Sequence, residues 1–144
     1  MNVAAAMRPP ASWARRNLWL TGLFGPLLVL TGAASLLLPA RLSLMSNAVP
    51  YDVFHIAFGV LGTALVVARS ARGAALFNVG FGAIDLYQAL AGVTGLFPAD
   101  LFHLKPADHA VHVLFGVLLV VFGVRYLTAP SPLQRAPKVH ASFE

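Results

Sequence analysis

The 144-residue chain contains no cysteine, which excludes disulfide bonds, thiolate nucleophiles and cysteine-ligated metal or iron–sulfur centres. Charged residues are also scarce: 10% of positions are Asp, Glu, Lys or Arg, whereas soluble domains carry about a quarter. The sequence has no Walker loop, nucleophile elbow or zinc-protease motif. These absences favour a membrane protein that is not an enzyme, and they identify no cofactor.

Apolar residues make up 58% of the chain, and the mean hydropathy is +0.77. Two long segments, 18–40 and 73–99, contain a single charge between them, and each exceeds the roughly 20 residues that span a bilayer. Two shorter segments lie between Asp and Arg residues, and none of the four shows the period-two alternation of membrane β-strands. We therefore expect an all-α integral membrane four-helix bundle. Its expected parts are an N-terminal segment 1–16, a transmembrane domain 17–128 with helices 17–38, 52–69, 74–97 and 108–127, and a flexible tail 129–144.

The basic residues are distributed unevenly about these spans. The N-terminus, the 69–73 loop and the C-terminal tail together hold eight Lys or Arg residues, and the other side holds only Arg41 and Lys105. The positive-inside rule then places both termini of the multi-pass membrane protein in the cytoplasm. Since the net charge of +5 flanks apolar segments, we expect a lipid bilayer as the partner rather than nucleic acid.

The second and fourth expected helices repeat each other. His55 and Gly59 match His112 and Gly116 at an offset of 57 residues. The repeat predicts two similar helical hairpins that run parallel, related by a pseudo-two-fold axis along the membrane normal.

Two acid–histidine pairs stand where these repeated helices begin, Asp52 with His55 and Asp108 with His112. In the simplest interpretation the aspartates cap the helices and the histidines hydrogen-bond across the bundle. In the alternative, the same four residues and His109 hold a metal ion, since imidazoles and carboxylates suit zinc or another first-row ion. Haem ligation by the two histidines and proton handling are further alternatives.

Asp85 is the one charged residue near the middle of the third expected helix, with Gln88 one turn later. A carboxylate at this depth is costly unless it is paired or protonated. We expect Asp85 to be neutral and hydrogen-bonded, with Gln88, Asn78, Thr31 or water as partner. Counting from Phe97 places Asp85 about 18 Å from the outer end of its helix, too deep to meet the histidines directly.

From Asn47 to Gly123 the pattern resembles small bacterial four-helix membrane proteins of domain-of-unknown-function family 4383. The matching residues are Asp52, His55, Gly59, Gly62, Asp108, His112 and Gly116. The resemblance implies a bacterial inner membrane and no established activity. We expect a non-enzymatic scaffold or partner subunit, with a homo-oligomer or another membrane protein as partner. The alternative is a small metal-, haem- or proton-handling membrane protein.

Overall fold

The computed structural model describes residues 9–130, and it is helical, without strands in this part of the chain. Four helices are long and apolar enough to cross a membrane: α2 (Ala11–Leu37), α3 (Val49–Val67), α4 (Ala71–Thr94) and α6 (Pro106–Leu127). Two short helices lie in the connections, η1 (Ala40–Leu42) after α2 and α5 (Ala99–Phe102) after α4. The all-α four-helix architecture expected from the sequence is confirmed.

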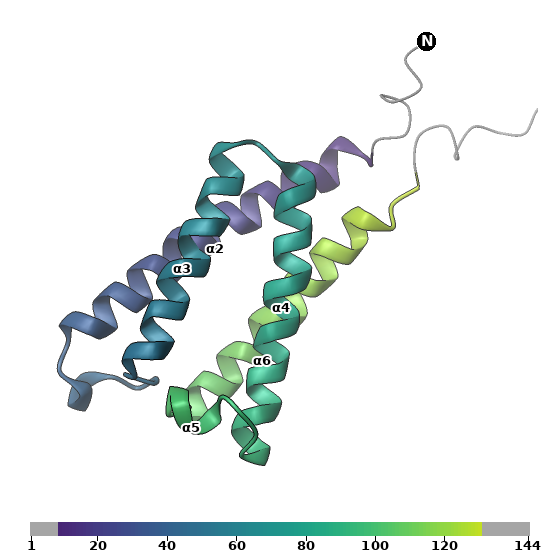
Figure 1. Cartoon of the computed structure of the whole chain (residues 1–144). Helices are drawn as coiled ribbons and strands as arrows, with labels where there is room; N and C mark the ends of the chain where they lie inside the picture. Colours follow the sequence, from purple (N-terminus) through teal and green to yellow (C-terminus); the bar gives the residue numbers. More distant parts are fainter. Residues whose placement is uncertain (1–8, 131–144) are drawn as a thin grey trace, which may run out of the picture.

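The helices form two hairpins, in which α2 packs along α3 and α4 packs along α6 (Figure 1). The start of α2, the end of α6 and the α3–α4 turn lie at one end of the bundle, called here the termini end. The 38–48 connection and α5 lie at the other end, called here the α5 end. Every helix therefore begins at the end where its predecessor stops, as a bundle that crosses one bilayer four times requires.

Local sequence explains where the helices start and stop. The Ser70 side chain caps α4 by accepting a hydrogen bond from the Gly73 amide, and α4 ends at Gly95, which adopts a left-handed conformation with φ of 71°. Pro106 occupies the first turn of α6, where a missing N–H is harmless. The α2 helix starts at Ala11, six residues earlier than expected, because Ala and Arg form helix well outside the apolar segment.

Glycines set the distance between the helices of each hairpin. A Cβ atom on Gly59 of α3 would lie 2.6 Å from the carbonyl oxygen of Gly25 in α2. A Cβ atom on Gly116 of α6 would lie 2.9 Å from the carbonyl oxygen of Gly82 in α4. Small residues allow such close approach between helices in a membrane, and both pairs sit where their hairpin helices cross.

The interior is layered along the bundle. Near the termini end a buried polar cluster joins α2 to α4: Thr21 Oγ1 donates to Asn78 Oδ1 (2.9 Å), and Asn78 Nδ2 donates to Asn17 Oδ1 (2.8 Å). An apolar layer follows, formed by Phe24, Leu28, Phe77, Phe81 and Leu119. Beyond it, toward the α5 end, lies a second set of buried polar residues.

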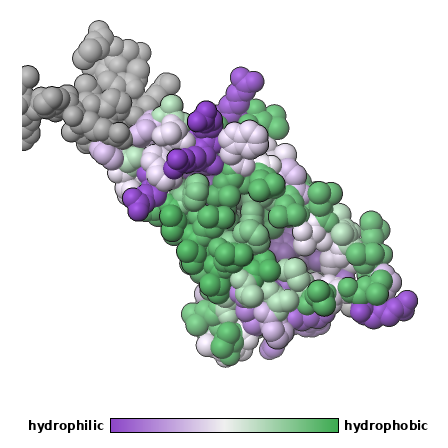
Figure 2. Space-filling view, turned by 180° about the vertical axis from the view of Figure 1, so that it is seen from behind, coloured by the Kyte–Doolittle hydropathy of each residue, from purple (hydrophilic) through white to green (hydrophobic). Residues whose placement is uncertain are grey.

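The outer surface is apolar over the middle of the bundle and polar at its ends (Figure 2). Large apolar side chains such as Leu23 (68% exposed) and Leu114 (64% exposed) point outward from the helices. A soluble bundle would bury these side chains, so the exposed apolar belt suits a lipid environment.

Candidate functional site

Tyr51, in the first turn of α3, is the centre of the polar set near the α5 end. Its side chain is 1% exposed, and its hydroxyl lies 2.7 Å from His112 Nε2 and 3.3 Å from Asp108 Oδ1, both on α6. The Tyr51 ring also lies against the His55 ring, with centroids 4.1 Å apart. Tyr51 thus joins the two acid–histidine pairs that the sequence places on different hairpins.

Asp108 is fixed by backbone amides. Its Oδ2 atom accepts hydrogen bonds from the amides of Lys105 (2.7 Å) and Ser46 (2.9 Å). The first bond ties Asp108 to the N-cap of its own helix, and the second holds the 38–48 connection against α6. Asp108 therefore caps α6 as expected, but from the third helical position rather than from the N-cap itself. Asp52 does not cap α3, whose N-cap residue is Ala48 and has no side-chain cap hydrogen bond.

The Tyr51 hydroxyl has one proton and two acceptors within reach, Asp108 Oδ1 at 3.3 Å and His112 Nε2 at 2.7 Å. Donation to Asp108 makes His112 Nε2 the donor and leaves a lone pair on Nδ1, whereas donation to Nε2 puts the ring proton on Nδ1. In residues 9–130 that buried Nδ1 has no hydrogen-bond partner, and neither has Nδ1 of His55.

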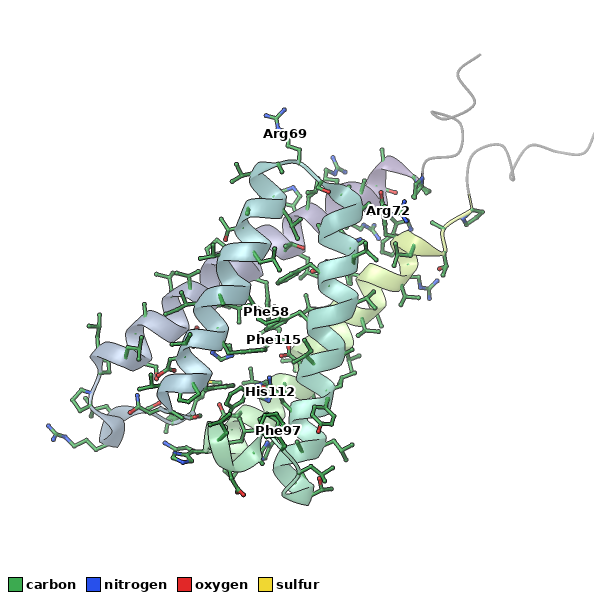
Figure 3. All side chains as sticks on the ribbon, in the orientation of Figure 1. Phe58, Arg69, Arg72, Phe97, His112 and Phe115 are labelled. Atoms are coloured by element: carbon green, nitrogen blue, oxygen red, sulfur yellow. The ribbon has the colours of Figure 1, made fainter. Side chains whose placement is uncertain are left out.

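Both histidines and Asp85 line one cavity of about 210 Å³. None of these three side chains is more than 5% exposed. The remaining walls are mainly apolar and aromatic, and Figure 3 shows His112 and Phe115 lying between the two hairpins. The lining residues are Phe24, Leu27, Leu28, Thr31, Met45, Tyr51, His55, Phe81, Asp85, Val111, His112 and Phe115.

Asp85 lines the same cavity as His55 and His112, although it lies deeper in the bundle than they do. Helix α4 ends at Thr94 rather than Phe97, so Asp85 lies about 14 Å from that end, while His55 lies about 9 Å into α3. The remaining offset of about 5 Å is one helical turn, which side chains can bridge.

None of the three protein residues expected to bond to Asp85, which are Thr31, Asn78 and Gln88, forms a hydrogen bond with it. Thr31 donates to the Leu27 carbonyl, and Asn78 is bonded to Thr21 and Asn17. Gln88 is buried, but its Oε1 atom has no partner. Within residues 9–130 the Asp85 carboxyl group has no hydrogen bond to protein, so it faces only the cavity.

The other two candidate metal ligands lie apart from the cavity. Asp52 lines a second hollow of about 470 Å³ with Ser35, and the His109 ring packs over Gly92 of α4. Among the described residues, no group of three or more His, Cys, Asp or Glu side chains is placed to hold a metal ion. The geometry therefore brings His55, His112 and Asp85 together and leaves Asp52 and His109 out.

The second hollow continues the cavity toward the α5 end. Thr31, Met45, Tyr51 and His55 line both. The hollow lies between α2 and the 38–48 connection, where exposed apolar side chains such as Leu44 (86% exposed) stand at its rim. It offers a path from the α5 end to the buried polar groups.

A family model for a domain of unknown function, DUF4383, matches residues 39–125, which is 87 of 144 positions. The chain belongs to this family. The match begins just after α2 and covers α3, α4 and nearly all of α6. It therefore includes Tyr51, His55, Asp85 and His112 of the cavity, whereas Thr31 lies outside it. No curated protein and no solved structure matches the chain.

Tyr51 is the functional residue that the sequence reasoning missed. The signal was present, because Tyr51 and Asp108 are 57 residues apart, the same offset that relates His55 to His112. Residues at equivalent positions of two similar hairpins meet near the axis between them. A tyrosine and an aspartate at equivalent positions could therefore have been predicted to form a hydrogen bond between the hairpins.

Proposed function

We propose that this membrane protein binds a small polar molecule inside its helical bundle, at the cavity between His55, Asp85 and His112. One observation carries the proposal: three polar side chains, each at least 95% buried, line one cavity. Asp85 has no hydrogen bond to protein within residues 9–130, and one ring nitrogen of each histidine has no partner. A buried polar group left unsatisfied costs about 1–3 kcal/mol. Three such groups around one space are accounted for by a guest that bonds to them.

The cavity also has the character of a binding site. Ligand sites are mostly apolar, with a few converging polar groups that orient the ligand. At about 210 Å³ the cavity is below the usual range of about 300–1,000 Å³, which favours a small molecule over a haem. The Tyr51 bond to His112 Nε2 also occupies the nitrogen that a haem iron would need.

Thermal unfolding of the purified full chain in detergent, with benzyl alcohol as probe, tests this proposal. Ligand binding to the folded state raises the melting temperature, and we expect a concentration-dependent rise for the wild type. Val111→Trp fills the cavity and should abolish the rise. Val113→Trp, on the exposed face of the same helix, controls for detergent effects and should retain it. A rise that is equal in both variants, or absent from the wild type, overturns the proposal.

A second candidate function, proton exchange at the same site, is favoured by the hydrogen-bond chain from Asp108 through Tyr51 to His112. Such a chain can move a proton by changing tautomers. The apolar layer of Phe24, Leu28, Phe77, Phe81 and Leu119 separates it from the polar cluster at the termini end. Proton flux through protein reconstituted in liposomes, abolished by Tyr51→Phe, would favour this candidate.

The scaffold or partner-subunit role stays a prediction, and so does assembly with further copies or other membrane proteins. It needs no guest in the cavity, so the benzyl alcohol experiment separates it from the binding function. A site for metal has less support, because the five residues proposed as ligands do not converge.

We also propose the finer architecture: two repeated hairpins in a bacterial inner membrane, with both termini in the cytoplasm. Contacts between positions 57 residues apart support the repeat, since Thr21 bonds to Asn78 and the Phe24 ring lies 6.2 Å from the Phe81 ring. The two close-contact glycine pairs are also related by this offset, because Gly82 and Gly116 lie 57 residues after Gly25 and Gly59. Arg69 and Arg72 at the termini end (Figure 3) support the orientation.

A further inference from the structure

We infer that the guest of the cavity is a small protonated amine, a class of ligand that suits both Asp85 and the aromatic wall. This inference rests on the proposed binding function and adds the chemical class of the ligand. It follows from three independent features of the cavity: its hydrogen-bonding character, its charge and its aromatic lining.

Asp85 is the polar group that carries the hydrogen-bonding character of the cavity, because it is buried, lines the cavity and has no hydrogen bond to protein within residues 9–130. As a carboxylate it accepts at both oxygens. A guest that pairs with it must supply N–H donors, and an ammonium group supplies three.

No described Lys or Arg lines the cavity to balance a charge on Asp85. The basic residues of the bundle lie at its ends, as Arg69 and Arg72 do in Figure 3. A cationic guest would supply the missing positive charge, and buried charges persist in proteins chiefly as pairs. A neutral amine that arrives through lipid would form the same pair by taking the proton of the Asp85 carboxylic acid, breaking one O–H bond and forming one N–H bond.

The aromatic side chains that face the cavity also favour a cation. Phe24, Tyr51, Phe81 and Phe115 all line it, and the rings of Phe24 and Phe115 pack edge to face with centroids 4.8 Å apart. The face of an aromatic ring attracts a cation within about 6 Å. A cavity of about 150 Å³ holds benzene, so the 210 Å³ here admits an amine of benzylamine size.

Competition between matched probes on the wild-type chain in detergent tests the inference. Benzylamine, benzyl alcohol and toluene have nearly the same shape but differ in charge and in hydrogen-bond donors. At neutral pH, where benzylamine is protonated, we expect calorimetric titration to show benzylamine binding at least tenfold more tightly than either neutral probe. Asp85→Asn should remove that advantage, so that benzylamine binds no more tightly than the neutral probes, and Asp100→Asn on the exposed surface of α5 should leave the advantage unchanged.

The outcomes separate the two proposals. If the neutral probes bind as tightly as benzylamine and Asp85→Asn has no effect, the amine inference is wrong and the binding function stands. If none of the three probes binds to the wild type, both are wrong. The wild-type comparison decides even if Asp85→Asn fails to fold.

Discussion

At the scale of single residues, the Tyr51 hydroxyl is the link between the two hairpins near the α5 end. Removing it leaves Asp108 Oδ1 and His112 Nε2 buried with one partner fewer. Because an unsatisfied buried polar group costs about 1–3 kcal/mol, we expect Tyr51→Phe to lower the free energy of unfolding by that amount. Denaturant unfolding in detergent measures the loss.

Tyr87→Phe is the matched control for this prediction. The Tyr87 hydroxyl donates to the Phe97 carbonyl (2.7 Å), but its side chain is 46% exposed. We expect a loss below about 0.5 kcal/mol, as for other surface substitutions. Equal losses from both variants would show that the Tyr51 network contributes nothing special.

The same substitution should lower the free energy of unfolding more at Asp108 than at Asp85. In Asp108→Asn an amide either turns its NH2 group toward the Ser46 and Lys105 amides or loses the bond to Tyr51, so we expect a loss of about 1–3 kcal/mol. Asp85→Asn should cost less than about 1 kcal/mol, because no protein donor faces this carboxyl group. Thermal unfolding of the two variants compares them. A loss of several kcal/mol from Asp85→Asn would show that the empty bundle needs a charged Asp85.

At the scale of helices, the close crossing of α4 and α6 depends on glycine. A Cβ atom on Gly82 would lie 2.8 Å from the Gly116 carbonyl oxygen, whereas nothing lies within 4 Å of one on Gly80. We expect Gly82→Ala to destabilise the bundle by about 1–3 kcal/mol through overpacking. Gly80→Ala in the same helix should be neutral or stabilising by up to about 1 kcal/mol. Unfolding of the two variants measures the difference, and a neutral Gly82→Ala would contradict the close crossing.

The helices themselves could be predicted from apolar length and composition, and all four were. Their ends were harder, because Ser70 and Gly95 act through local capping that hydropathy does not register. The short helices η1 and α5 were missed since polar and proline-rich connections carry no periodic pattern. The end of α4 at Thr94, three residues before the expected end, sets how α4 lies along α3. The cavity that Asp85 shares with His55 and His112 depends on this packing, which the apolar pattern does not register.

At the scale of the whole molecule, the orientation in the membrane is open to a direct test. The natural chain has no cysteine, so a single introduced cysteine reports one position. Leu44 lies at the α5 end and Ala68 at the termini end, and both are exposed. With a membrane-impermeant maleimide on intact cells stripped of their outer membrane, we expect Leu44→Cys to label and Ala68→Cys to remain unlabelled. The reverse pattern would invert the proposed topology.

The central claim is that the bundle holds a polar cavity whose walls accept hydrogen bonds from a guest. Nitrogen-15 NMR of the histidine-labelled chain, titrated with benzylamine, tests it most directly. We predict that the ring nitrogen resonances of His55 and His112, which line the cavity, move as benzylamine is added to the wild type but not to Val111→Trp. Resonances of both histidines that stay in place at saturating benzylamine would contradict the claim.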